Sequence, residues 1–224
     1  MSRTPLIDLD VERPAEARPT IDVSGLPEAA NDWRAPIWWG NNLLLVIETA
    51  MFGILVAAYL YYWSVDFSQW PPPHVSTHPA NLDPNPKLLG STIETVLMLL
   101  SLVPAIMCDR ACVRFDARRV KVTVVIVLLI ELVAGALRIH GFKELHHSYD
   151  DNAYGSITWG ILFLHLLHII VSLAETALVA VWVFRHGLDA RHARDTRVSL
   201  VYWYWIVGIW VPLYLLVFWG PRVL

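Results

Sequence analysis

Long uninterrupted runs of apolar residues recur along the chain, separated by shorter polar segments. A helix that crosses about 30 Å of hydrocarbon, at a rise of about 1.5 Å per residue, needs roughly 20 apolar residues. Five segments meet this length, with approximate bounds 38–63, 88–107, 120–137, 157–184 and 200–219. The pattern therefore predicts an all-α membrane protein, a bundle of five transmembrane helices in a domain that covers residues 36–224.

The distribution of basic residues predicts how this bundle is oriented, because cytoplasmic loops carry an excess of arginine and lysine. The segments that follow the second and fourth predicted helices are the basic ones, with Arg110, Arg114, Arg118, Arg119 and Lys121 in the first and Arg185, Arg191, Arg194 and Arg197 in the second. The other two connections hold only Lys87, and Lys143 with Arg138 at a helix end. This alternation predicts a cytoplasmic N-terminus and a C-terminus on the outer, periplasmic side. Residues 1–35, which mix prolines with charges of both signs, are expected to form a mobile cytoplasmic tail.

The composition excludes several classes of protein. Of the 224 residues, 56% are hydrophobic, whereas soluble domains average about 45–50%. The 11 tryptophans suit a protein with two membrane–water interfaces, where such amphipathic rings collect. The formal net charge is -3 and the basic residues form no groove-like patch, so nucleic acid is not an expected partner.

Four titratable residues lie inside predicted spans at comparable depth: Glu48, Glu131, His165 and His168. Charged side chains near the bilayer centre cost about 2.5–3.5 kcal/mol on insertion scales, so these groups are expected to face protein or water. One interpretation is a buried polar network that joins helices or holds a lipid headgroup or a proton. The alternative is a set of separate protonated glutamates, each hydrogen-bonded to a neighbouring backbone carbonyl; similar depth is compatible with both.

The spacing of His165 and His168 argues against a metal or haem site. Side chains at positions i and i+3 leave the same face of a helix, so they cannot supply the two opposite axial ligands of one haem. A mononuclear metal would need carboxylates as its remaining ligands, and a helix-packing histidine pair is the favoured interpretation. The sequence also contains no Gly-rich phosphate loop, GxSxG or HExxH motif, so we expect no autonomous active site.

Four stretches carry a resemblance to a known family. They are NNLLLVIETAMFGILVAAYLYYW with its buried glutamate, the WPPP that follows it, NAYGSITWGILFLHLLHIIVS with its histidine pair, and YWYWIVGIWVPLYLLVFWGP. In this order and spacing, across roughly residues 38–220, they resemble subunit III of cytochrome c and quinol oxidases. Glu48 matches the membrane-buried glutamate of that family, and His165 and His168 match its histidine pair.

The resemblance implies an accessory role. Subunit III packs beside catalytic subunit I, which carries the haems and copper, and has no redox centre of its own. We therefore expect a non-catalytic subunit of an aerobic respiratory terminal oxidase, which reduces oxygen with electrons from cytochrome c and pumps protons. The resemblance further implies no cofactor in this chain, partners that include subunit I and other oxidase subunits, bound phospholipid, and a multi-pass location in a bacterial cytoplasmic (inner) membrane.

The sequence departs from the family at three places. Full-length members have seven helices; the resemblance implies that this chain is of the shorter bacterial type without the first two, in which one wall of the lipid cleft is expected to be missing or to come from another subunit. Tyr204 and Val207 stand where the family usually has a histidine and an aspartate. Arg138, Gly141 and Phe142 stand at the usual glutamine and Glu-Tyr positions.

Three alternative functions stay open at the level of sequence. One is the related accessory subunit of a quinol oxidase or nitric oxide reductase, which the co-purifying catalytic subunit would distinguish. Another is a small proton channel or transporter in which the glutamates and histidines that lie at comparable depth pass protons between them. The third is an intramembrane metalloenzyme at the HLLH sequence, which metal analysis of the pure protein would test.

Overall fold

The computed structural model describes residues 35–65, 70–72 and 85–223, and within these ranges the chain forms helices and turns but no strand. The long helices are α1 (Pro36–Val65), α2 (Leu88–Val113), α3 (Ala117–Gly141), α4 (Ala153–His186) and α5 (Ala190–Tyr214). Short turns continue two of them: η1 (Phe142–Glu144) follows α3, while the π-helical η2 (Leu215–Trp219) and α6 (Gly220–Val223) follow α5. Among these described residues, five helices are long and apolar enough to cross a membrane, which confirms the prediction of an all-α protein with five spans. Of the predicted tail, residues 1–34 lie outside the described residues.

The helices extend beyond their predicted bounds, most clearly at the start of α5, which begins at Ala190 rather than near residue 200. The turn before it is set by Gly187, whose φ is 82°, and by Asp189, whose side chain accepts a hydrogen bond of 2.8 Å from the backbone N–H of His192. That hydrogen bond holds the pKa of Asp189 below its usual value. Hydropathy identifies only the apolar part of a helix, whereas capping groups decide where it ends. Most of the basic residues assigned to loops are therefore helical: Arg110 on α2, Arg118, Arg119 and Lys121 on α3, Arg185 on α4, and Arg191, Arg194 and Arg197 on α5.

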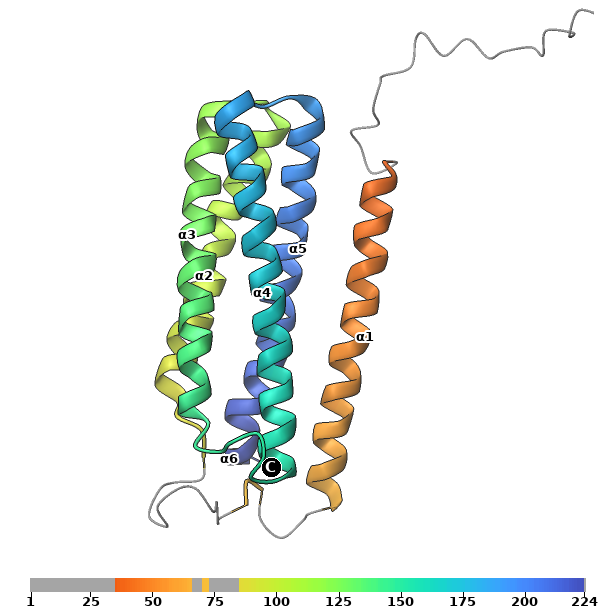
Figure 1. Cartoon of the computed structure of the whole chain (residues 1–224), viewed down its shortest axis with the longest axis vertical. Coiled ribbons are helices and arrows are strands. Elements are labelled where there is room, and N and C mark those ends of the chain that lie inside the picture. The colour runs from red at the N-terminus through yellow and green to blue at the C-terminus, as the bar shows by residue number, and fades with distance from the viewer. Residues whose placement is uncertain (1–34, 66–69, 73–84, 224) are drawn as a thin grey trace, which may run out of the picture. The chain divides into compact units, whose positions relative to one another are not determined.

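Helices α2, α3, α4 and α5 pack as a bundle in which each contacts two neighbours, and α1 packs against α4 and α5 (Figure 1). The α2–α3 and α4–α5 turns lie at the same end of the bundle as the start of α1 (Figure 1). An ion pair of 2.7 Å between Arg197 Nε and Asp109 Oδ1 joins α5 to α2 near that end. At the opposite end, Arg222 donates a hydrogen bond of 2.7 Å to the carbonyl of Pro86. The two turns with the neighbouring arginines, which we call the arginine-rich turns, thus lie at one end of the bundle. The alternation of basic and non-basic connections along the sequence predicts this arrangement.

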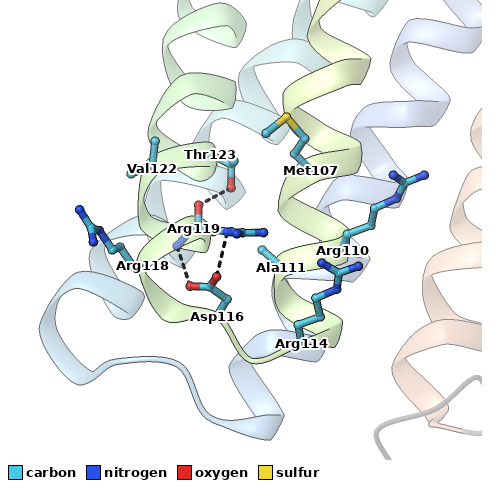
Figure 2. A pocket seen from close by; sticks show the side chains of 9 residues that line it. All are labelled: Met107, Arg110, Ala111, Arg114, Asp116, Arg118, Arg119, Val122 and Thr123. Atoms are coloured by element: carbon cyan, nitrogen blue, oxygen red, sulfur yellow. Dashed lines mark hydrogen bonds and ion pairs between the residues drawn. The ribbon is translucent and has the colours of Figure 1, made fainter.

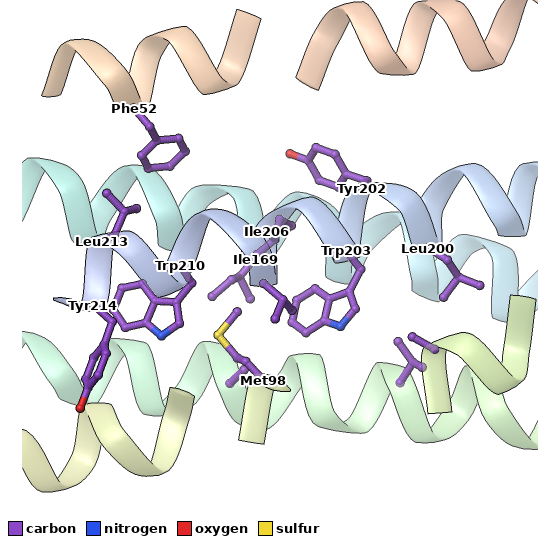
Figure 3. Packing of buried hydrophobic residues seen from close by; sticks show 14 of the residues in the cluster. Phe52, Met98, Ile169, Leu200, Tyr202, Trp203, Ile206, Trp210, Leu213 and Tyr214 are labelled. Atoms are coloured by element: carbon purple, nitrogen blue, oxygen red, sulfur yellow. The ribbon is translucent and has the colours of Figure 1, made fainter. Parts of the chain in front are cut away.

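Helix α5 supplies much of the core. Its buried side chains recur at alternating spacings of three and four residues, the pattern of a helix packed along one seam: Trp203, Ile206, Trp210 and Leu213. Val217 of η2 continues this seam. Figure 3 shows several of them beside Met98 of α2 and Ile169 of α4.

Two indole N–H groups join α5 to α2 within this core. Trp203 Nε1 donates to Ser101 Oγ at 2.9 Å, and Trp210 Nε1 donates to Thr95 Oγ1 at 2.9 Å. A buried indole usually finds an acceptor, because an unpaired N–H in an apolar medium is costly. These bonds fix the register of α5 against α2.

Helix α1 is attached along one face. Only Phe52 and Tyr59 of its residues are buried. The ring of Phe52 contacts that of Trp205 with centroids 5.9 Å apart, and Trp205 Nε1 donates to Thr49 Oγ1 at 2.8 Å. The side chains that point away from α4 and α5 are apolar and 60–69% exposed: Leu43, Val46, Ile47 and Ile54. This exposed face suits contact with hydrocarbon or with another membrane subunit.

The first turn of α4 requires a glycine. Asn152 caps the helix by accepting a hydrogen bond of 2.8 Å from the backbone N–H of Gly155. A Cβ atom at Gly155 would overlap the backbone carbonyl oxygen of Ser148, which cannot move as a flexible side chain could. The glycine therefore allows the preceding loop to approach the start of α4.

We predict that Gly155→Ala destabilises the protein by about 1–3 kcal/mol, because overpacking against backbone forces local shifts. Gly160→Ala is the control, since a Cβ there meets no atom within 4 Å and alanine is the better helix former. Thermal unfolding of the purified protein in mild detergent measures both. Equal midpoints for the two variants would contradict the steric argument.

Candidate functional site

Glu48 of α1 and His168 of α4 form a hydrogen-bonded pair. The distance from Glu48 Oε2 to His168 Nε2 is 3.0 Å, and His168 Nδ1 lies 2.6 Å from the backbone carbonyl oxygen of Leu164. Because a carbonyl oxygen only accepts, Nδ1 carries a proton. Glu48 and Nε2 then share one further proton, as a carboxylic acid donating to imidazole or as an imidazolium donating to a carboxylate. Either form leaves the pair without net charge, which suits an apolar span.

His165 has a different partner. Its Nε2 donates to the backbone carbonyl of Ile206 at 3.1 Å, which joins α4 to α5. Its Nδ1 has no hydrogen-bond partner among the residues that the structure describes. The two histidines of the HLLH sequence therefore bond in different directions, one to α1 and the other to α5.

Glu131 of α3 bonds to hydroxyls of α4. Its Oε1 accepts hydrogen bonds of 3.0 Å from Ser172 Oγ and 3.1 Å from Thr176 Oγ1. Its other oxygen has no partner among the described residues. The four sequence-predicted residues thus belong to three separate sets of hydrogen bonds, of which one brings Glu48 and His168 together. Their role in lipid binding stays a prediction.

Arg138 and Glu94 form a buried ion pair that the sequence-predicted site did not include. Arg138 of α3 binds Glu94 of α2 through both Nε, at 2.9 Å, and Nη2, at 2.6 Å from the same oxygen, Oε1. Both side chains are almost fully buried, with 1% and 2% exposed. The guanidinium carbon of Arg138 lies 3.4 Å from the ring centroid of Trp210 on α5, a cation–π contact.

A signal for this pair was present in the sequence. Glu94 lies near the start of the second span and Arg138 near the end of the third. Because the two helices run in opposite directions, these positions have the same depth. Opposite charges at one depth in apolar helices are expected to pair, since each alone would be costly.

Ring contacts connect this ion pair to the Glu48–His168 pair. The ring of Trp210 lies 5.0 Å from that of His165, and Phe52 contacts both His165 and His168, at 6.2 and 5.3 Å between centroids. We call the connected residues the polar–aromatic core: Glu94, Arg138, Trp210, His165, Phe52, His168 and Glu48. The core takes side chains from all five long helices. Among the described residues, no group of three or more His, Cys, Asp or Glu side chains is placed to hold a metal ion.

Comparison with known proteins gives the family. The family model described as cytochrome c oxidase subunit III matches residues 30–221. The chain belongs to the cytochrome c oxidase subunit III family. It is an accessory oxidase subunit, a multi-pass membrane protein that works in a complex with other oxidase subunits.

Curated subunit III proteins resemble it at low identity. The cytochrome c oxidase subunit 3 of Thermostichus vulcanus is 23% identical over 181 residues, which cover 80% of this chain and 85% of that protein. The subunit 3 of Cyprinus carpio is 21% identical over 180 residues, covering 80% of this chain and 68% of the carp protein. That of Lycodon semicarinatus is 23% identical over 96 residues, covering 41% of this chain and 37% of the snake protein.

Arg138 contacts side chains of two neighbouring helices. The sequence marked Arg138 as standing where the family usually has a glutamine. In the structure its charge is matched by Glu94 and its planar face by Trp210. Arg138 therefore provides a charged link between α2, α3 and α5.

We predict that Arg138→Met destabilises the subunit by about 3–5 kcal/mol, because it leaves the carboxylate of Glu94 buried and unpaired. The double variant Glu94→Leu/Arg138→Met is expected to regain much of that loss, since apolar side chains can fill the same space. The midpoint of unfolding in mild detergent measures both variants.

The control for this prediction is Arg119→Met. Arg119 pairs with Asp116 at 3.0 Å, but its side chain is 69% exposed, so the expected loss is below about 1 kcal/mol. A similar loss for Arg138→Met and Arg119→Met would show that the buried pair contributes nothing special to stability.

Proposed function

We propose that this subunit III is the non-catalytic accessory subunit of a bacterial cytochrome c oxidase that couples oxygen reduction to proton pumping, and that it stabilises catalytic subunit I and holds phospholipid. The observation that carries this proposal is that polar side chains within the spans form hydrogen bonds between helices. Glu94, Arg138, Glu131, His165 and His168 are hydrogen-bonded within the bundle and join its helices. This supports a role in which haem and copper belong to the partner subunits.

The apolar exterior supports association within the membrane. One face of α1 carries the exposed side chains of Leu43, Val46, Ile47 and Ile54. Glu48 lies at the edge of this face with 19% of its side chain exposed. A lipid or a neighbouring subunit on α1 can therefore reach the Glu48–His168 pair, and the proposed lipid role of Glu48 follows from this position.

The positions of the arginines support the proposed orientation. Both arginine-rich turns lie at one end of the bundle, and the positive-inside rule assigns this end to the cytoplasm. The N-terminus is then cytoplasmic and the C-terminus periplasmic, in a bacterial inner membrane.

The alternative of a proton channel has less support. A relay needs groups that pass a proton onward, yet both ring nitrogens of His168 are engaged, and Glu131 bonds to a separate set of hydroxyls. Proton flux through proteoliposomes that contain the subunit alone would reverse this preference. A quinol oxidase or nitric oxide reductase complex remains the sister alternative, which the identity of the partner separates.

We predict that the subunit, tagged and purified from its native membrane in mild detergent, carries with it a haem-binding catalytic subunit and copper. The partners are identified by mass spectrometry, and the haem by its absorbance spectrum. The isolated subunit is expected to show no Soret band. A stoichiometric Soret band in the isolated chain, or a chain that stands alone in its native membrane, would overturn the proposal.

A second prediction concerns Glu48. Glu48→Gln keeps a hydrogen-bonding side chain opposite His168 but removes the carboxylate form of the pair. The oxidase is expected to assemble normally, to retain less phospholipid and to inactivate severalfold sooner during turnover. Turnover number before inactivation and phospholipid content of the purified complex are the measurements.

Glu175→Gln is the matched control. Like Glu48 of α1, Glu175 of α4 lies within a span, but it is exposed and its carboxylate accepts no hydrogen bond from the described residues. Inactivation kinetics and lipid content that are the same for both variants would count against a specific role of Glu48.

A further inference from the structure

A pocket of about 650 Å³ lies between the end of α2 and the start of α3, at the arginine-rich end of the bundle (Figure 2). This volume is within the range of small-molecule sites, about 300–1,000 Å³. The residues that line the pocket are Met107, Arg110, Ala111, Arg114, Asp116, Arg118, Arg119, Val122 and Thr123. None of them belongs to the polar–aromatic core.

The charge of this arginine pocket is not balanced from within. Asp116 accepts a hydrogen bond of 3.1 Å from the backbone N–H of Arg119 and forms an ion pair of 3.0 Å with the Arg119 side chain. Arg110, Arg114 and Arg118 make no side-chain hydrogen bond or ion pair with any residue that the structure describes. Four arginines against one aspartate give the lining a formal charge of +3. Such a cluster attracts an anion that can accept several guanidinium hydrogen bonds, and phosphate is suited to this.

The apolar and basic residues of the pocket lie at different depths along α2 and α3. Met107 and Val122 lie toward the middle of the spans and are 55% and 56% exposed, while the arginines lie toward the turn (Figure 2). Phe115, at the tip of the turn, is 56% exposed, as aromatic side chains at the membrane interface often are. The pocket therefore presents hydrocarbon-compatible surface on its membrane side and guanidinium groups at the interface.

We propose that this arginine pocket binds the phosphate headgroup of an anionic phospholipid, with the acyl chains lying along Met107 and Val122. Basic pockets between transmembrane helices on the cytoplasmic side are suited to anionic headgroups. A free phosphate ion shares the charge chemistry but uses none of the apolar lining, and an acidic protein segment would not extend into the hydrocarbon. The inference depends on the five spans and on the proposed orientation, and not on the oxidase assignment.

The test uses the full-length subunit in mild detergent, titrated with phosphatidylglycerol, phosphatidylcholine, inorganic phosphate or an acidic peptide. Ligand retention is measured by native mass spectrometry and stabilisation by the unfolding midpoint. Phosphatidylglycerol is expected to bind more tightly than phosphatidylcholine, and phosphate alone is expected to leave the unfolding midpoint unchanged. Arg114→Gln/Arg118→Gln is expected to weaken phosphatidylglycerol binding about 30-fold, the loss of two arginine–headgroup contacts.

The matched control removes two arginines from the same end of the bundle. Arg185→Gln/Arg191→Gln changes exposed side chains near the α4–α5 turn and is expected to leave binding unchanged. Arg114→Lys/Arg118→Lys keeps the charge and is expected to retain most of the binding, which separates charge loss from misfolding.

Three results would overturn the proposal. The first is an equal loss of phosphatidylglycerol binding in Arg114→Gln/Arg118→Gln and Arg185→Gln/Arg191→Gln, which would mean that the lipid is attracted by the overall charge and not by the pocket. The second is inorganic phosphate that stabilises the protein as well as phosphatidylglycerol does, which means a free-anion site. The third is an acidic peptide that binds with the expected dependence on Arg114 and Arg118 while phosphatidylglycerol does not.

Discussion

The ion pair of Glu94 and Arg138 joins two apolar helices through charges that hydrocarbon would not tolerate singly. Its geometry is favourable because the guanidinium binds the carboxylate through two nitrogens and lies against the face of Trp210. Helices α2, α3 and α5 are thereby held in one register, and the indole of Trp210 reaches Thr95 of α2 as well. Since lipid offers no competing hydrogen bonds, such polar contacts specify which helix faces meet. Helix α4 packs against α3 and α5 of this group, and α1 packs against α4 and α5.

The same constraint explains how the polar residues of this subunit III are used. His165 bonds to the backbone of α5, Glu131 to two hydroxyls of α4, and His168 to Glu48 of α1. Each of these contacts crosses from one helix to another. These polar side chains therefore join the helices of this accessory subunit.

The surface of the bundle has two kinds of region that the interior does not explain. The outer face of α1 is apolar and exposed, and it is suited to lipid or a neighbouring subunit. The arginine pocket combines exposed apolar side chains with the guanidinium groups of Arg110, Arg114 and Arg118, which lack partners among the described residues. Their chemistry differs: the α1 face can bind by shape and dispersion alone, whereas the arginine pocket selects for negative charge. Glu48 lies at the border of the first region, where a bound molecule can influence the bond to His168.

The sequence alone determined the number of spans and the placement of the arginines at alternate connections, because both follow from local composition. It also carried the family resemblance, through motifs such as the buried Glu48 and the histidine pair. It did not determine where α5 begins, since capping by Asp189 and the turn at Gly187 decide that end. Nor did it decide the partners of Glu48, Glu131 and His165, because depth along a helix fixes a level in the membrane but not the rotation of the helix about its axis. Only the packing of all five helices sets those rotations, and with them the pairing of Glu94 with Arg138 and of Glu48 with His168.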